Sequence, residues 1–171
     1  MFKILGLMSL FFASGMIGIY KGMGLRDRIV LLEDYKKMIL ALRSRINYYR
    51  EPLPLAFQRL SKTADSRAFK VLNSCIDELN KKDGEISQIW AEKVKESYEK
   101  TTLKQEDIKT LQFAGQFLGQ TDFENQLQQF QYLDEKLDEI LLDAKSDYKS
   151  RGTLYSKTGF FIGTILVILL L

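Results

Sequence analysis

The chain contains no histidine among its 171 residues. Histidine is the commonest general base near neutral pH and the commonest metal ligand, so its absence removes the usual starting point for either kind of site. The phosphate-binding patterns GxxxxGK[ST] and GxGxxG and the CxxC pair are missing as well. We therefore expect no catalytic residue, no metal and no cofactor. The enzymatic alternative is a site at a membrane surface that uses Asp and Lys alone.

Cysteine and proline are almost as scarce. The single cysteine, Cys75, excludes a disulfide within the chain and suits a reducing compartment. It shares an apolar helical stripe with Leu72 and Leu79, which indicates a small core residue rather than a reactive thiol. The two prolines are Pro52 and Pro54, and no long Gly- or Ser-rich stretch occurs. A flexible linker between two domains is therefore not expected.

The net charge of +3 is unevenly distributed. Residues 29–144 carry 17 basic and 20 acidic side chains, whereas basic residues dominate the flanking stretches 21–28 and 145–157. A nucleic-acid-binding protein needs a basic face, so we expect no nucleic-acid partner. Basic residues beside apolar runs mark the cytoplasmic side of a membrane. The distribution therefore favours a cytoplasmic central domain.

Two apolar runs occupy the ends of the chain. The first, residues 4–20, lies between Lys3 and Lys21 and would span roughly 26 Å as a helix. The second, residues 158–171, would span about 21 Å, so it either crosses a locally thinned bilayer or dips in without crossing. The predicted organisation is an N-terminal transmembrane helix (1–22), a cytoplasmic helical bundle (23–157) and a C-terminal hydrophobic membrane segment (158–171).

The first run also has features of a cleaved signal peptide. It has basic Lys3, an apolar core and the small residues Ala13, Ser14 and Gly15, although no clear small-x-small cleavage pattern ends it. Cleavage would place the helical domain outside the cell. The alternative function is therefore a membrane-anchored extracellular helical adaptor or structural protein.

Small residues recur at helical spacing in both runs. Ser14, Gly18 and Gly22 follow one another every four residues, and Gly159 and Gly163 have the same spacing. Such spacing lets helix backbones approach closely in lipid. We predict either a packed pair of membrane helices or a contact between copies in a homo-oligomer. The alternative is that glycine is simply frequent in membrane helices.

The region between the runs has the apolar periodicity of soluble helices. The best-specified helix is residues 26–49, where the spacing 3, 4, 3, 4, 3 defines a coiled-coil-like seam. This seam consists of Leu32, Tyr35, Ile39, Leu42, Ile46 and Tyr49. No strand-like alternation with turn signals appears. The fold class is all-α: an antiparallel bundle of about six helices with a membrane helix at each end.

Capping signals give the predicted boundaries of the later helices. The prolines open a second helix that ends near residue 64, and Asp65 or Ser66 caps a third helix that ends at residue 79. A fourth covers residues 86–100. Capping boxes at Thr102–Gln105 and Thr121–Glu124 begin the fifth and the sixth, and Gly119 takes the left-handed conformation between them. The sixth runs to about residue 150, with a kink at Gly152.

Two surface clusters are candidates for binding. Arg43, Arg45, Tyr48 and Arg50, near the end of the first bundle helix, form a possible contact with an acidic partner. The arginines also suit the negative end of the helix dipole, which is the structural alternative. An acidic cluster has the spacing for a hard cation, but a solvated helix face is the preferred interpretation. Its members are Asp134, Glu135, Asp138 and Glu139.

Three stretches of the chain have a pattern in common with a known family. The first is the helix with Ile46 and Tyr48, followed by Pro52 and Leu53. The second is the most specific and consists of Leu103, Lys104, Leu111, Leu118, Gly119, Asp122 and Gln126. The third is the leucine-rich terminus after Lys157. Together they resemble the stage III sporulation protein AB family, membrane proteins of endospore-forming Firmicutes. The family usually has a glutamate before the isoleucine of the first stretch, where this chain has Arg45.

The resemblance implies a function that the periodicity does not. The family is similar to the cytoplasmic helical domains of the platform protein of type II secretion, its F component. It implies a non-catalytic platform in a secretion-like channel between mother cell and forespore, needed for endospore formation. The implied partners are a cytoplasmic secretion-type ATPase and the other channel membrane proteins. The implied location is the mother-cell membrane around the forespore.

Overall fold

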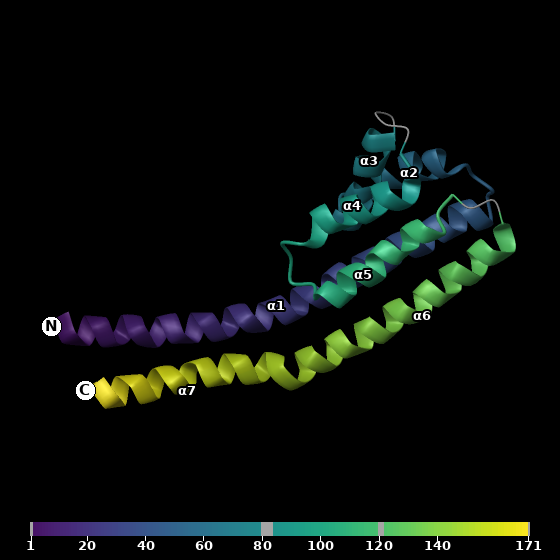
Figure 1. The fold of residues 1–171 in the computed structure, drawn as a ribbon. Helices are drawn as coiled ribbons and strands as arrows, with labels where there is room; N and C mark the ends of the chain where they lie inside the picture. The colour runs from purple at the N-terminus through teal and green to yellow at the C-terminus, as the bar shows by residue number, and fades with distance from the viewer. Residues whose placement is uncertain (1, 80–83, 120–121, 171) are drawn as a thin grey trace. The chain divides into compact units, whose positions relative to one another are not determined.

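The computed structural model describes residues 2–79, 84–119 and 122–170, and all of their regular structure is helical (Figure 1). The all-α prediction is therefore confirmed for these residues. The helices are α1 (Phe2–Asn47), α2 (Leu53–Ser61), α3 (Arg67–Leu79), α4 (Ile86–Tyr98), α5 (Gln105–Phe113), the 3₁₀-helix η1 (Ala114–Gln116), α6 (Phe123–Asp147), the π-helix η2 (Tyr148–Gly152) and α7 (Thr153–Leu170).

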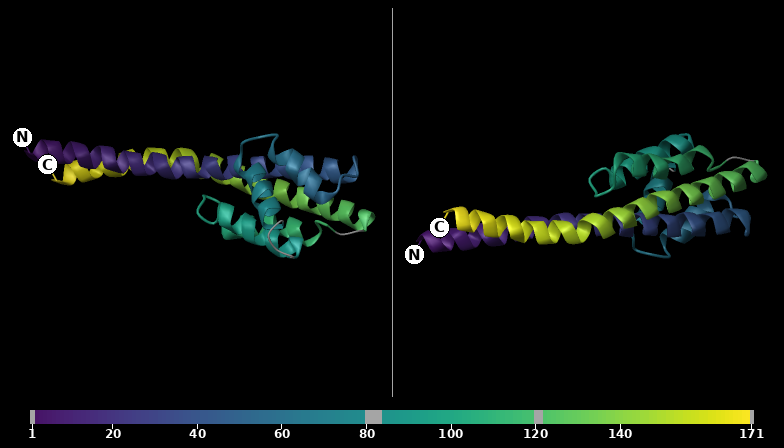
Figure 2. Two further views of the ribbon diagram at one scale, coloured as in Figure 1. Left: turned by 90° about the horizontal axis from the view of Figure 1, so that it is seen from above. Right: turned by 90° about the horizontal axis from the view of Figure 1, so that it is seen from below.

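The chain divides into two compact units. The first consists of Met1–Ile29 and Leu142–Leu171, and the second of Val30–Leu141. Both α1 and α6 contribute residues to each unit. Within the first unit, the N-terminal part of α1 and α7 run antiparallel, with the two ends of the chain at the same end of the pair (Figures 1 and 2).

The core of the second unit confirms most of the predicted seam. Leu32, Tyr35, Ile39 and Leu42 are fully buried or nearly so. The seam does not extend to Tyr49, which is 62% exposed because α1 ends at Asn47. Burial of these side chains removes apolar surface from water and thereby stabilises the bundle.

Aromatic side chains from α1 and α4 meet in this core. The ring of Tyr35 lies 6.4 Å from that of Trp90 and 6.2 Å from that of Tyr98, both in edge-on geometry. The Tyr35 hydroxyl and the Trp90 indole N–H donate to the carbonyl oxygen of Leu111, over 2.5 and 3.1 Å. Buried tyrosine and tryptophan need such partners, so these two bonds fix the position of α5 against α1 and α4.

The helix caps differ from the predicted ones. Ser66 precedes α3, but its hydroxyl is buried without a hydrogen-bond partner, and the Ala68 amide donates over 3.1 Å to the carboxylate of Asp34 on α1. The fifth helix begins at Gln105, where the carboxylate of Asp107 accepts from the Lys104 amide, so the predicted Thr102–Gln105 box is wrong.

The described residues at the start of α6 show one capping contact, and they do not test the predicted Thr121–Glu124 box. The side chain of Asp122 accepts from the Asn125 amide over 3.3 Å, at the start of α6. Thr121, which belonged to the predicted box, lies outside the described residues. The prediction for Gly119 is confirmed, since its φ is +84° and only glycine adopts such a conformation without strain.

The terminal segments are helical. A search of the described residues finds no helix that combines the length and the apolar character needed to span a membrane. At the predicted kink, Gly152 is buried and closes the π-helical turn η2, a one-turn departure from α-helical hydrogen bonding that typically bends a helix.

Candidate functional site

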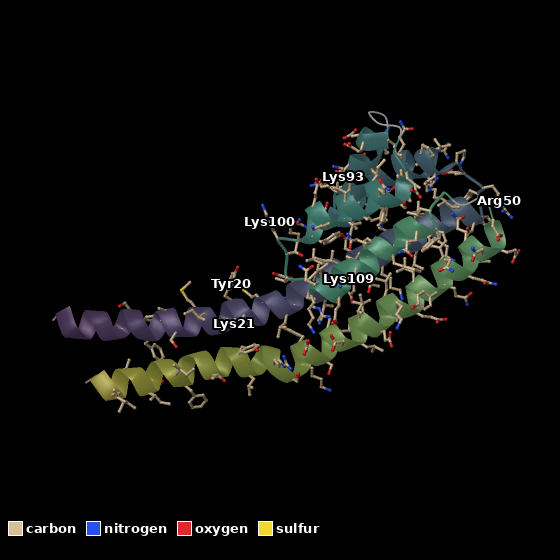
Figure 3. All side chains as sticks on the ribbon, in the orientation of Figure 1. Tyr20, Lys21, Arg50, Lys93, Lys100 and Lys109 are labelled. Atoms are coloured by element: carbon tan, nitrogen blue, oxygen red, sulfur yellow. The ribbon has the colours of Figure 1, made fainter. Side chains whose placement is uncertain are left out.

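The predicted partner-contact residues lie at the C-terminal end of α1 and in the turn that follows. Arg43 and Arg45 are half-buried on the last turns of the helix, and Tyr48 is 81% exposed just beyond it. Arg50 lies in the turn (Figure 3), with a φ of 55°, a left-handed conformation that is uncommon for a residue with a side chain. The chain reverses here before Pro52 and α2.

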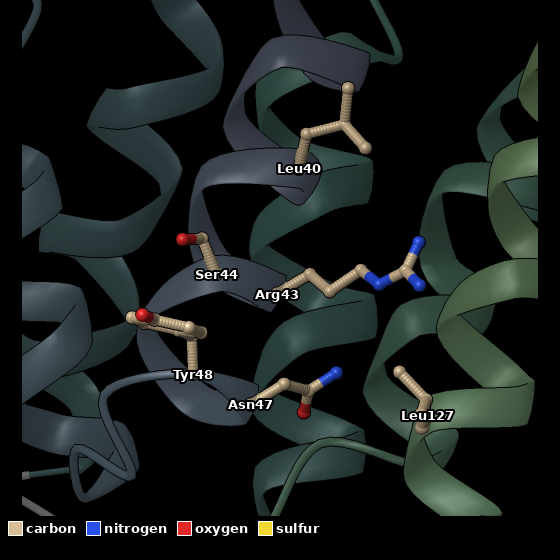
Figure 4. Close-up of a pocket in the computed structure, with 6 residues that line it drawn as sticks. All are labelled: Leu40, Arg43, Ser44, Asn47, Tyr48 and Leu127. Carbon is tan, nitrogen blue, oxygen red and sulfur yellow. The ribbon is translucent and has the colours of Figure 1, made fainter.

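A shallow pocket of about 360 Å³ opens beside this helix end. Its lining residues come from α1, from the turn after it and from α6, and they are Leu40, Arg43, Ser44, Asn47, Tyr48 and Leu127. In Figure 4, Arg43 and Asn47 extend from α1 towards Leu127, whereas Ser44 and Tyr48 leave the helix on its other side. The structure therefore brings Arg43 and Tyr48 to one pocket and leaves Arg45 and Arg50 outside its lining.

The arginines around the pocket differ in their ion pairs. The guanidinium of Arg45 lies 3.1 Å from a carboxylate oxygen of Glu51, and Arg59 on α2 lies 2.7 Å from the same oxygen. Arg43 has no carboxylate within ion-pair distance in the described part of the chain, and the pocket lining contains no acidic residue. Within the pocket lining, the charge of Arg43 is therefore available to a partner.

The side-chain amide of Asn47 is the second unusual feature of the pocket. Its nitrogen and oxygen are both buried, and neither has a hydrogen-bond partner among the described residues. A buried polar atom without a partner costs about 1–3 kcal/mol, so native proteins keep few of them. The rim is aromatic, since Tyr48 and Tyr49 pack edge-to-face with their ring centroids 5.2 Å apart. The buried amide and the exposed aromatic pair therefore lie at the same end of α1.

The small residues predicted to pack helices all lie in the first unit. Gly18 and Gly22 are buried on α1. A Cβ added to Gly163 of α7 would lie 3.3 Å from the Cβ of Ser14 and 3.3 Å from the carbonyl oxygen of Phe11. The two backbones therefore approach closely at Gly163. Gly159 lies one turn earlier in α7, and its surroundings are not among those described.

Much of the apolar surface of this first unit remains exposed. On α1, Phe12, Met16 and Ile17 are 60–70% exposed. On α7, Phe161, Ile162, Ile165, Ile168 and Leu169 are also exposed. Monomeric soluble proteins rarely expose a contiguous apolar surface of this kind, so it indicates contact with an apolar medium or with another protein.

The predicted acidic cluster is part of an ion-pair network rather than a plain solvated face. The ammonium of Lys36 on α1 lies 3.0 Å from the carboxylate of Asp134 and 2.6 Å from that of Asp138. Burial lowers the pKa of Lys36, but the hydrogen bonds to the two carboxylates outweigh it and raise the pKa above its usual value. Within the described ranges, no group of three or more potential ligands is arranged to hold a metal ion.

A second network lies in the first unit. The side chain of Arg28 is 3% exposed, and both of its terminal nitrogens lie 3.0 Å from Asp143, with Asp147 at 3.3 Å. Arg28 belongs to the basic stretch 21–28 beside the first apolar run. Its guanidinium forms ion pairs with two aspartates of α6, which connect α1 to α6. A buried arginine needs such partners.

One further pocket was not predicted. It measures about 500 Å³ and is lined by Ser87, Gln88, Ala91, Lys109, Gln112, Phe113 and Gln116, from α4 to η1. The Gln112 side chain spans the two helices by donating to the Ala91 carbonyl over 2.7 Å. No motif marks these residues, because their proximity depends on how α4 packs against α5.

Neither the thiol nor the buried tyrosines are prepared for chemistry. Burial raises the pKa of the Cys75 thiol to about 12, which keeps it protonated at physiological pH. Burial also raises the pKa of Tyr35 and of Tyr98 well above the usual value for a phenol.

Comparison with known proteins assigns the family. The family model described as stage III sporulation protein AB matches residues 3–171. The chain belongs to the stage III sporulation protein AB family. A curated relative of this name from Bacillus subtilis (strain 168) is 22% identical over 171 residues, which is the full length of both chains.

A solved structure of stage III sporulation protein AB has the same fold. It superimposes with a TM-score of 0.64 at 20% identity, covering 71% of this chain and 96% of the solved one. The resemblance of the three sequence stretches to this family is thereby confirmed. Membership of the stage III sporulation protein AB family supports a role in sporulation.

Proposed function

We propose that this chain is a non-catalytic membrane platform in a secretion-like channel between mother cell and forespore, and that endospore formation requires it. Its bundle would receive force or a conformational change from a cytoplasmic secretion-type ATPase and pass it to the terminal helices. The other membrane proteins of the channel, and further copies of this chain, would be its neighbours in the membrane.

The observation that carries this proposal is the helical continuity of both ends. Residues 2–47 form the single helix α1, and residues 123–170 are helical throughout as α6, η2 and α7. A helix is a semi-rigid spacer, whereas a Gly- or Ser-rich linker behaves as a random coil and would absorb motion. Continuous helices are therefore suited to coupling a cytoplasmic bundle to its anchors.

Exposed apolar side chains support an anchoring role for the terminal helices. They project from both α1 and α7, where lipid would cover side chains that water does not favour. Tyr20 and Lys21 close the apolar part of α1 (Figure 3), and the Lys21 ammonium lies 5.9 Å from the ring centroid of Tyr155 on α7. Tyrosine and lysine are typical of the membrane–water interface.

The charge distribution supports a cytoplasmic bundle. The basic stretches 21–28 and 145–157 adjoin the apolar runs, as the positive-inside rule requires. The pairing of Arg28 with two aspartates reduces this excess without reversing it. Both ends of the chain would then lie on the far side of the membrane or within it.

A clean deletion in the source organism tests the proposed function. Sporulating cells would be followed by microscopy, with a copy of the intact gene at a second locus as the control. We expect arrest after engulfment, collapse of the forespore and no mature spores, all reversed by the second copy. Normal spores from the deletion strain would contradict the proposal.

A further inference from the structure

We propose that the pocket at the C-terminal end of α1 binds a short, extended and acidic peptide segment of a partner protein. Arg43 would hold a carboxylate of this segment, and Leu40, Tyr48 and Leu127 would contact an apolar neighbour of that carboxylate. The proposal concerns the chemistry of the occupant and does not depend on the channel role.

Charge complementarity specifies an acidic occupant. None of the six lining residues is acidic, and Arg43 supplies the formal charge of the lining. The nearby Arg45 and Arg59 pair with Glu51 within the chain, whereas Arg43, the basic residue of the pocket lining, has no ion-pair partner among the described residues. An arginine fork binds a carboxylate through two parallel hydrogen bonds, which gives both affinity and orientation.

The remaining lining specifies an apolar residue beside the acid. Leu40 is 39% exposed and Leu127 is half-buried, so both present hydrocarbon to the pocket. Tyr48 and Tyr49 form an exposed aromatic pair at the rim. Tyrosine and arginine are enriched among the residues that dominate binding energy at interfaces, and here both types occur on the last turns of one helix.

The size of the pocket and the state of Asn47 indicate a segment rather than a folded domain. A volume of about 360 Å³ is at the lower end of the ~300–1,000 Å³ range of ligand pockets, so it accepts a few side chains. The buried Asn47 amide has one nitrogen and one oxygen without partners. A peptide backbone carries one hydrogen-bond donor and one acceptor per residue. It could therefore supply a partner for both the oxygen and the nitrogen of this amide.

Selection from a random peptide library tests the proposal. Dodecapeptides displayed on phage would be selected on the full-length chain in detergent micelles, in parallel with the Arg43→Gln and Arg26→Gln variants. Arg26 is an exposed arginine on the same helix, far along the sequence from the pocket, and serves as the matched control. A Tyr48→Ala variant probes the apolar rim, and circular dichroism verifies that each variant keeps its helix content.

We expect Asp or Glu beside an aliphatic residue to be enriched on the intact chain and on Arg26→Gln, but not on Arg43→Gln. Tyr48→Ala should keep the acidic preference and weaken the apolar one. The best selected peptide, labelled with fluorescein, should bind about tenfold more weakly to Arg43→Gln, by fluorescence anisotropy. The same peptide with Asn or Gln in place of Asp or Glu should bind the intact chain with the same loss of affinity.

Two results would overturn the proposal. One is the absence of acidic enrichment on the intact chain, or its persistence on Arg43→Gln. The other is dimerisation of the intact chain, measured by sedimentation, that Arg43→Gln abolishes. The second result would assign the pocket to another copy of this chain instead of an acidic peptide.

Discussion

The reactivity of Cys75 gives the sharpest physical test of the packed core. Its side chain is fully buried on α3, and burial raises the pKa of the thiol from 9.0 to about 12. At pH 8 an ordinary thiol is about 10% thiolate, whereas a thiol of pKa 12 is about 0.01% thiolate. Because the thiolate is the nucleophile, labelling of the folded chain should be about 1,000-fold slower than that of an exposed cysteine.

The assay is the rate of reaction with a disulfide reagent such as dithionitrobenzoate at pH 8. The matched control carries Cys75→Ala and Asn73→Cys, which moves the thiol two residues along α3 to an exposed position. Urea should raise the rate for Cys75 to that of the control. If native Cys75 reacts within tenfold of the control, α3 does not pack as described and the reasoning from burial is wrong.

The same thiol contributes to the pH dependence of stability. Its folded pKa of about 12 exceeds its unfolded value of 9.0, so its stabilising contribution is complete below pH 9 and is lost as the pH rises towards 12. The full difference corresponds to about 4 kcal/mol as an order of magnitude. The Cys75→Ala variant should therefore lose less stability than the intact chain between pH 9 and pH 12, measured by urea denaturation.

Three further predictions concern backbone contact and charge. A Cβ at Gly115 would lie 3.0 Å from a backbone oxygen and from the buried indole. Gly115→Ala should therefore lower the free energy of unfolding by about 1–3 kcal/mol and Tm by several degrees. In the control Gly84→Ala, the added Cβ meets only a flexible side chain, so Tm should change little. Lys36→Met should lower the free energy of unfolding by about 1 kcal/mol at pH 7, a modest loss because the ion pairs are partly exposed. The folded pKa of Lys36 is raised, so this difference in stability should persist below pH 10.5 and disappear as the pH rises through the folded pKa. A difference in denaturation midpoint that stays constant with pH would refute the ion pairing of Lys36. Gly163→Leu should speed amide hydrogen exchange in α7 in detergent micelles, because the backbones of α1 and α7 approach closely there. The control Gly6→Leu has open space around it and should leave the exchange rate unchanged. Equal exchange rates in the two variants would mean that α1 and α7 are not in close contact.

Much of the fold follows from local sequence patterns. The seam from Leu32 to Leu42 required only the spacing of apolar residues, because a helix presents positions three and four apart on one face. Gly119 was identifiable because a left-handed turn favours glycine. Cys75 lay in an apolar stripe, and its burial follows from that position.

The helix caps could not be predicted in the same way. Ser66 has the right residue type at the right position, yet the structure satisfies the amide of Ala68 with Asp34, more than thirty residues earlier in the chain. A tertiary contact thus replaced a local one. The predicted box at the start of α5 failed for a different reason: the N-cap is Lys104, two residues after Thr102, and the local carboxylate of Asp107 accepts from the Lys104 amide.

The candidate site was partly accessible from sequence. The residue types of Arg43 and Tyr48 and their position at a helix end marked a possible contact, and the structure places both on one pocket. Arg45 lies two positions after Arg43 and therefore on a different face of α1, where it pairs with Glu51. Leu127 lies far away in the sequence, so its contribution required the packing of α6.

Insertion of a flexible linker tests the coupling between bundle and terminal helices most directly. A Gly/Ser segment inserted at Gly152 would interrupt the helical path from α6 to α7 while keeping every side chain of the bundle. The same segment inserted after Gly84, in an exposed loop, is the control. The account predicts that the insertion at Gly152 abolishes spore formation and that the control insertion does not. Full sporulation with the linker at Gly152 would contradict coupling through continuous helices.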